Sequence, residues 1–200
     1  MNRLSLRKAI VITSLIMLAA IVLQGIACAP KAPPPLPPAP PAGTIAVEPP
    51  KIDYAKVEEM FNLFVTVRKL PPAAAAAMPP CVGILALPIT FTGEGWPADS
   101  WVFIELVVLP GVEIPGLEPG ADSVGIAMGK TDSEGRLEAL METTAKLNFL
   151  LRGAWTPYFT PDLTKADPLP AGTYTIKAFG TDRRTVTTIT WELGLVPPAK

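Results

Sequence analysis

The feature that most constrains the fold is a proline-rich tract over residues 30–50, in which about half of the residues are proline. Each proline fixes φ and lacks the backbone N–H group that helices and sheets require. We therefore expect residues 28–50 to form an extended polyproline II linker that rises about 3.1 Å per residue. The linker separates a short N-terminal segment from roughly 150 residues that can build one folded domain.

The N-terminal segment, residues 1–27, has the pattern of an export signal or membrane anchor. Three basic residues within the first eight precede an apolar run over residues 9–23. Positive charge before a short apolar run holds the amino terminus on the cytoplasmic side while the rest of the chain crosses the membrane. We therefore expect the remainder of the chain to be extracytoplasmic, in the cell envelope or outside the cell.

Cys28 is the expected point of attachment to the membrane. Cleavage after Ala27 would make this cysteine the first residue of the mature chain, whereas cleavage two residues later would place Pro30 directly after the scissile bond. Ile26, Ala27 and Cys28 resemble the lipobox of bacterial lipoproteins, which implies that Cys28 carries a lipid. Plain secretion and an uncleaved anchor of about nineteen residues are the alternatives.

The composition excludes several classes of function. The chain has no histidine, which removes Ser-His-Asp and Cys-His catalysis, HExxH zinc proteases and most zinc sites. Beyond the export segment the chain is mildly acidic and has no lysine and arginine cluster with interleaved aromatic residues, so no nucleic-acid partner is expected. We also expect no cofactor and no metal. Cys81, the second cysteine, is expected to be buried and unreactive.

A helical pattern follows the linker over residues 51–71. Apolar side chains recur there at three- and four-residue spacing, at Ile52, Val57, Met60, Phe61, Phe64 and Val67. Prolines flank the segment on both sides and set its expected ends. The broad apolar face of this amphipathic helix is expected either to pack against the domain or to associate with a second copy. A connector rich in alanine and proline, residues 72–81, follows.

Over residues 82–196 the apolar period shifts towards two, which predicts β-strands. The clearest are Trp101 to Leu109, Thr173 to Phe179 and Thr187 to Leu193, each with alternate apolar side chains on one face. Turns rich in glycine, proline and aspartate separate them. This pattern favours a mainly β domain, an antiparallel sandwich, over a βαβ fold. Residues 144–152 are expected to form a short helix in a crossing connection.

Three motifs in this region resemble the immunoglobulin-like β-sandwich modules of bacterial and archaeal surface proteins. They are Gly93-Glu94-Gly95-Trp96-Pro97, Thr131-Asp132-Ser133-Glu134-Gly135 and Pro170-Ala171-Gly172-Thr173-Tyr174-Thr175. The resemblance covers roughly residues 85–195 and implies an immunoglobulin-like sandwich. It says little about function, because such modules serve as spacers, adhesins and carbohydrate binders.

Candidate binding residues are few. Trp155, Tyr158 and Phe159 lie on a loop that contains several prolines. They could form an aromatic platform that stacks on sugar rings or on a partner surface. The alternative interpretation is that these side chains pack into the end of the core. The acidic segment 132–134 lacks the alternating ligands of an EF-hand, so a hairpin turn is favoured over a calcium site. No cleft with paired carboxylates is indicated, and we expect no catalytic activity.

Together these patterns predict a membrane-tethered, extracytoplasmic structural or binding module that is not an enzyme. One alternative is a carbohydrate- or protein-recognition domain that acts through the aromatic loop 155–159. Another is a subunit of an envelope assembly that associates through the helix over residues 51–70. The expected partners are the membrane, through the lipid or anchor, and an envelope protein or polysaccharide.

Overall fold

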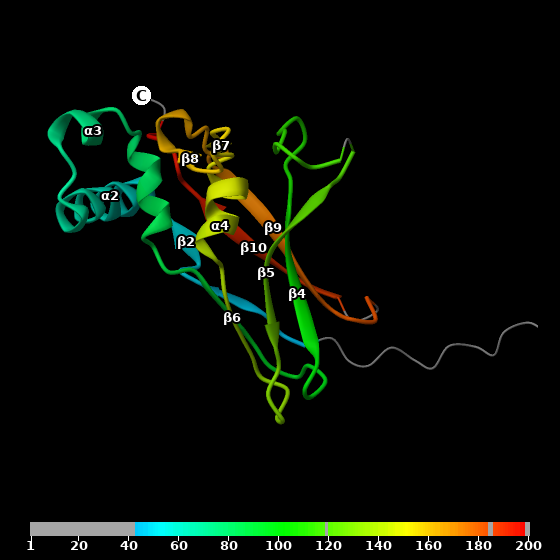
Figure 1. The fold of residues 1–200 in the computed structure, drawn as a ribbon. Helices are drawn as coiled ribbons and strands as arrows, with labels where there is room; N and C mark the ends of the chain where they lie inside the picture. The colour runs from blue at the N-terminus through cyan, green and yellow to red at the C-terminus, as the bar shows by residue number, and fades with distance from the viewer. Residues whose placement is uncertain (1–42, 119, 184–185, 199–200) are drawn as a thin grey trace, which may run out of the picture. The chain divides into compact units, whose positions relative to one another are not determined.

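The computed structural model describes residues 43–118, 120–183 and 186–198 of the 200-residue chain. The predicted export segment, Cys28 and most of the predicted linker lie outside the described residues. The described part of the chain is mainly β, with antiparallel and mixed sheets and few helices (Figure 1). None of the helices in this part has the length and apolar character needed to cross a bilayer.

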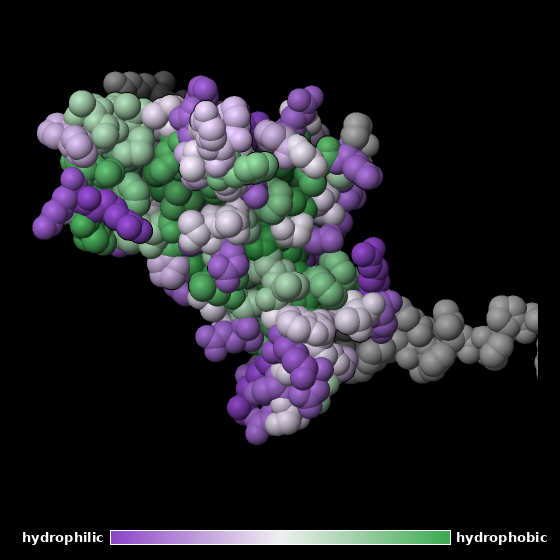
Figure 2. Space-filling model, viewed as in Figure 1, coloured by the Kyte–Doolittle hydropathy of each residue, from purple (hydrophilic) through white to green (hydrophobic). Residues whose placement is uncertain are grey.

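Two sheets make up most of the domain. The three-stranded sheet has the order β1-β3-β6, with strands at Ala46–Glu48, Thr90–Gly93 and Leu137–Leu140. The five-stranded sheet has the order β2-β10-β9-β4-β5, with strands at Lys51–Ile52, Val186–Leu193, Gly172–Gly180, Trp101–Val107 and Ser123–Lys130. This second sheet curls into a half-barrel. Hydrophilic residues gather at the end where β5 turns into β6 (Figure 2).

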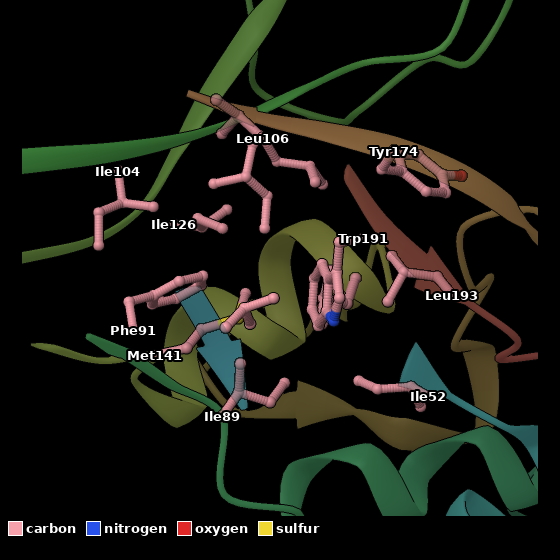
Figure 3. Close-up of a cluster of buried hydrophobic side chains, with 14 of the residues drawn as sticks. Ile52, Ile89, Phe91, Ile104, Leu106, Ile126, Met141, Tyr174, Trp191 and Leu193 are labelled. Atoms are coloured by element: carbon pink, nitrogen blue, oxygen red, sulfur yellow. The ribbon is translucent and has the colours of Figure 1, made fainter. Parts of the chain in front are cut away.

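One cluster of buried side chains contains residues from both sheets. On β4, the alternate residues Val102, Ile104 and Leu106 are fully buried, as the two-residue period predicts. The same cluster contains Phe91 of the three-stranded sheet and Trp191 of β10 (Figure 3). The strands predicted from residues 101, 173 and 187 onward are confirmed as β4, β9 and β10.

The predicted linker boundary at residue 50 is wrong. Ala46–Glu48 forms β1, which pairs antiparallel with β3, and Lys51–Ile52 forms β2, which pairs parallel with β10. Pro49 and Pro50 lie between these two strands, where the chain passes from one sheet to the other. Proline is tolerated there because it falls at the ends of short edge strands and not inside a ladder. The β domain predicted over residues 82–196 therefore also includes strands at residues 46–48 and 51–52.

The predicted helix over residues 51–71 is shorter in the structure. Helix α2 spans Tyr54–Arg68, because residues 51–52 belong to β2 and Lys69 turns into the left-handed region with φ 50°. Val57 and Phe61 are buried where the 3-10 helix η1 (Pro80–Leu85) packs against α2. Val67 remains 67% exposed, so only part of the predicted apolar face packs against the domain.

The predicted connector over residues 72–81 is also corrected. It contains helix α3 (Pro72–Ala76) and the first residues of η1, since an alanine run that follows a proline readily starts a helix. Cys81, on η1, is buried as expected. The short helix expected over residues 144–152 is present as α4 (Thr143–Ala145), which continues into a π-helical turn, η2 (Lys146–Leu150).

Candidate functional site: an aromatic hairpin

Trp155, Tyr158 and Phe159 lie together on one β-hairpin. Strand β7 (Ala154–Trp155) pairs antiparallel with β8 (Pro161–Asp162), with Trp155 opposite Pro161. Tyr158 and Phe159 are each 87% exposed, and Trp155 is 46% exposed. The interpretation that these aromatic side chains plug the core is therefore wrong.

Hydrogen bonds between Thr156 and Thr160 fix the tip of this aromatic hairpin (residues 154–162). The Thr156 N–H donates to the Thr160 carbonyl over 2.9 Å, and the two hydroxyl oxygens lie 2.6 Å apart. The Phe159 N–H donates to the Thr156 carbonyl over 3.0 Å, and Phe159 has a φ of 56°. A left-handed backbone is unfavourable for a bulky residue and persists where surrounding hydrogen bonds impose it. The tip therefore holds Tyr158 and Phe159 outward in a defined turn.

The polar groups of Trp155 and Asp162 on the aromatic hairpin form hydrogen bonds within the chain. The Trp155 indole N–H donates to the side-chain oxygen of Asn148, on η2, over 2.9 Å. The Asp162 carboxylate accepts hydrogen bonds from the N–H and the hydroxyl of Thr164, on the 3-10 helix η3 (Leu163–Lys165), over 3.2 and 2.6 Å. The Thr164 hydroxyl, followed by the ammonium group of Lys165, lowers the pKa of Asp162.

Arg152 fixes the base of the aromatic hairpin. Its side chain is 17% exposed, and its guanidinium group forms an ion pair with the Asp167 carboxylate over 2.6 Å. The same group donates to the carbonyls of Asp167, Glu113 and Pro168 over 2.8, 3.1 and 3.4 Å. Leu151, the preceding residue, is fully buried in the core. The aromatic hairpin thus projects from a base that is tied to the core and to the segments that hold Glu113 and Asp167.

The acidic segment 132–134 is a turn between β5 and β6. The Asp132 carboxylate accepts hydrogen bonds from the N–H groups of Glu134 and Arg136 over 2.8 and 2.9 Å. The N–H of Arg136 makes the largest contribution to lowering the pKa of Asp132. This geometry is that of the expected hairpin turn. Within the described ranges, no three histidine, cysteine, aspartate or glutamate side chains gather in a way that could hold a metal ion.

Two further tryptophans, Trp96 and Trp101, lie outside the aromatic hairpin. Trp96 is buried, and its indole N–H donates to the Thr44 carbonyl over 2.9 Å. Trp101 is 46% exposed at the start of β4. Neither belongs to the aromatic hairpin, so the candidate site consists of Trp155, Tyr158 and Phe159.

An apolar groove that the sequence did not indicate lies beside β5. It has a volume of about 500 Å³, and its lining includes Phe103, Met128, Leu140, Ala145, Phe179 and Arg183. The rings of Phe103 and Phe179 stack with their centres 5.8 Å apart. These residues come from both sheets and from α4, so no local sequence signal could have brought them together.

Comparison with known proteins gives no match for this chain, either among protein-family models or among curated proteins. The aromatic hairpin and the exposed part of helix α2 are the two surfaces of the described residues from which we infer function.

Proposed function

We propose that this chain is a membrane-tethered, extracytoplasmic recognition module, without catalytic activity, that binds a protein of the cell envelope through the aromatic hairpin. The observation that carries the proposal is the 87% exposure of both Tyr158 and Phe159 on a tip fixed by hydrogen bonds. Burial of each ring in a partner would contribute about 2 kcal/mol. A tip that is already ordered loses little conformational entropy on binding.

The engaged polar groups favour a protein partner over a polysaccharide. The hydroxyls of Thr156 and Thr160 bond to each other, and the Asp162 carboxylate is bonded to Thr164. A sugar site needs free hydrogen-bonding groups beside its aromatic surface to fix the orientation of the ligand. A hydrophobic pocket on a protein can accept the Tyr158 and Phe159 rings without such groups.

The strand order supports an immunoglobulin-like sandwich as the scaffold. In that fold, strands A, B and E lie in one sheet, and strands G, F and C, extended in some members by C′, lie in the other. The orders β1-β3-β6 and β10-β9-β4-β5 follow this arrangement. Tyr174, near the start of β9, donates its hydroxyl hydrogen bond to the Pro170 carbonyl over 2.9 Å. This contact has the form of the tyrosine corner of such domains.

The position of the aromatic hairpin suits a tethered module. Strand β1, which lies within the last residues of the predicted linker, starts at the end of the sheets where β4 begins, and β7 and β8 lie at the end where β4 finishes (Figure 1). A tether that joins the domain at Gly43 would therefore leave the aromatic hairpin at the distal end. Such a placement would present Tyr158 and Phe159 to partners beyond the attachment point.

A second candidate function rests on helix α2. Leu63 and Val67 on this helix are 51% and 67% exposed, so part of its apolar face is open to contact. This exposure favours the alternative of an envelope-assembly subunit that associates through α2. The aromatic hairpin remains the preferred surface because Tyr158 and Phe159 are more exposed than Leu63 and Val67, and because its backbone is fixed at both the tip and the base.

Photo-crosslinking at the tip tests the proposal. In the full-length chain, Pro157, which is exposed beside Tyr158, is replaced by a benzophenone amino acid, and intact cells are irradiated. We expect an adduct of defined mass with one envelope protein, and we expect Tyr158→Ser combined with Phe159→Ser to abolish it. The same crosslinker at Thr188, exposed on β10, is the matched control and should give no such adduct.

Four other results would contradict the proposal or redirect it. An adduct that persists in the double variant, or no adduct at all, contradicts binding of a protein by the aromatic hairpin. Retention on purified envelope polysaccharide that depends on Tyr158 would favour a sugar partner. An adduct formed from a crosslinker at Val67, and not at Pro157, would favour assembly through α2.

A further inference from the structure

Strand β5 forms an unpaired edge that carries a charge only at its last residue, Lys130. It is the last strand of the five-stranded sheet, and among the described residues it pairs only with β4. Its first seven residues, Ser123 to Gly129, include neither a charged residue nor a proline, the residues that commonly protect sheet edges. Met128 on this strand is 60% exposed, and Leu140 in the adjoining groove is 52% exposed. Backbone N–H and C=O groups without a strand partner and exposed apolar side chains thus lie together along the edge of β5.

The pairing with β4 shows which β5 residues share a face. Phe103 and Glu105 alternate with the buried residues of β4, and they lie opposite Met128 and Gly125 respectively. Residues opposite each other in an antiparallel pair point to the same face, so Met128 and Gly125 both lie on the outer face of the sheet. Ile126 is the extra residue of a bulge between them.

Gly125 leaves an open position on that outer face. A Cβ atom built on Gly125 meets no other atom within 4 Å. If two β5 strands pair antiparallel with Met128 of one copy opposite Gly125 of the other, each exposed methionine covers the open position of its partner. Because the pair of chains has two-fold symmetry, the contact between Met128 and Gly125 occurs twice.

The same register brings opposite charges together. It places Lys130 opposite Ser123 of the second copy, on the same outer face. The Ser123 hydroxyl lies 2.8 Å from a Glu105 carboxylate oxygen and 3.2 Å from an Asp122 carboxylate oxygen. Lys130 forms an ion pair with Asp99 over 3.3 Å within its own chain. This pair is exposed to solvent and contributes little free energy, so Lys130 can exchange it for a new partner. Each Lys130 ammonium group would therefore meet the carboxylates of Glu105 and Asp122 at the end of the paired strands, where Asp122 also lies 4.0 Å from the Lys177 ammonium group of its own chain.

We infer that two copies of this chain associate through their β5 edges, with Met128 opposite Gly125 and Lys130 opposite Ser123, to form one sheet that runs through both domains. The pairing buries the exposed Met128 side chain and satisfies the outward backbone groups of β5. It does not rest on the recognition function, since the aromatic hairpin and β5 are separate surfaces.

Site-directed disulfide formation in the full-length protein tests the register. The double variant Gly125→Cys with Met128→Cys is oxidised mildly in the membranes of the cells that make it and run on a non-reducing gel. The open space at Gly125 accommodates the new side chain. We expect a reducible dimer as the main species, whereas Thr188→Cys, exposed on β10, should remain monomeric.

Charge variants give an independent readout. Lys130→Glu in the double-cysteine background should lower the dimer yield about fivefold, the effect of losing exposed ion pairs. Addition of Glu105→Lys and Asp122→Lys should restore the yield.

A double-cysteine chain that stays monomeric while its thiols react with maleimide would overturn the inference. A dimer that forms equally well from Thr188→Cys, or a crosslink to a chain of different mass, would also overturn it.

Discussion

The indole nitrogen of Trp155 lies 2.9 Å from the side-chain oxygen of Asn148, so the π-helical turn η2 holds the ring at the base of the aromatic hairpin. Leu147 and Leu150, on either side of Asn148, are buried in the core. π-Helical turns are rare and are frequently found at functional sites. The contact therefore connects an exposed aromatic group to the rigid interior, which gives the proposed recognition surface a fixed position.

The Trp155 indole N–H should lose its protection in Asn148→Ala. Because one hydrogen bond contributes about 1 kcal/mol, we expect hydrogen exchange at this group to become roughly fivefold faster. The exchange is measured by nuclear magnetic resonance, with the Trp155 indole signal assigned from Trp155→Phe. Asn148→Asp keeps an acceptor oxygen and serves as the matched control. An unchanged rate in Asn148→Ala would show that Asn148 does not hold the ring.

Gly83→Ala should destabilise the domain through the contact between η1 and α2. A Cβ atom at Gly83 would lie 2.0 Å from the Val57 carbonyl oxygen and 2.5 Å from the Phe61 backbone nitrogen. Both neighbours are helix backbone and cannot rotate away, so we expect a loss of about 3 kcal/mol in the free energy of unfolding. Urea denaturation measures it. Gly172→Ala, whose Cβ meets only the Leu109 side chain at 3.5 Å, is the control and should change stability little.

Cys81 should make stability fall at alkaline pH. Burial raises the pKa of its thiol from 9.0 to about 11. Between these values the unfolded chain releases the proton and the folded chain retains it, so the contribution is complete below pH 9 and declines as the pH rises towards 11. The free energy of unfolding of the native chain, relative to Cys81→Ala, should drop by on the order of 2 kcal/mol across this window. A relative stability that stays constant from pH 8 to 11 would contradict this account.

The mass of the mature chain tests the predicted tether. We expect a chain that begins at Cys28 and carries a diacylglycerol group, and we expect Cys28→Ser to lose the lipid. Mass spectrometry of the protein extracted from its own membranes provides the measurement. A chain that retains Met1 would indicate an uncleaved anchor, and an unmodified N-terminal Cys28 would contradict lipidation.

The two-residue period of apolar side chains predicted the strands of the core, but it did not predict the short strand β1. Val102, Ile104 and Leu106 were identifiable because alternation along one strand needs no knowledge of its neighbours. Strand β1 escaped prediction because three residues before a pair of prolines are too few to display a period. Its existence depends on pairing with β3, a contact that only the folded chain supplies.

The aromatic loop illustrates the same limit at the candidate site. The sequence identified Trp155, Tyr158 and Phe159 as candidates. It did not decide whether their side chains are exposed or packed in the core, because exposed and buried aromatic residues look alike in a sequence. The deciding contacts are the Trp155 bond to Asn148 and the hydrogen bonds between Thr156 and Thr160. The groove beside β5 carried no sequence signal, since its walls come from both sheets and α4.

The most direct test of the recognition function is the affinity of the crosslinked partner, once purified, for the native protein and for Tyr158→Ser combined with Phe159→Ser. Trp101→Ser is the matched control, because Trp101 is 46% exposed but lies outside the aromatic hairpin. We predict that the double variant binds about 100-fold more weakly, as loss of two central aromatic anchors implies, and that Trp101→Ser binds like the native chain. Native affinity in the double variant, with its fold intact, would contradict recognition through the aromatic hairpin.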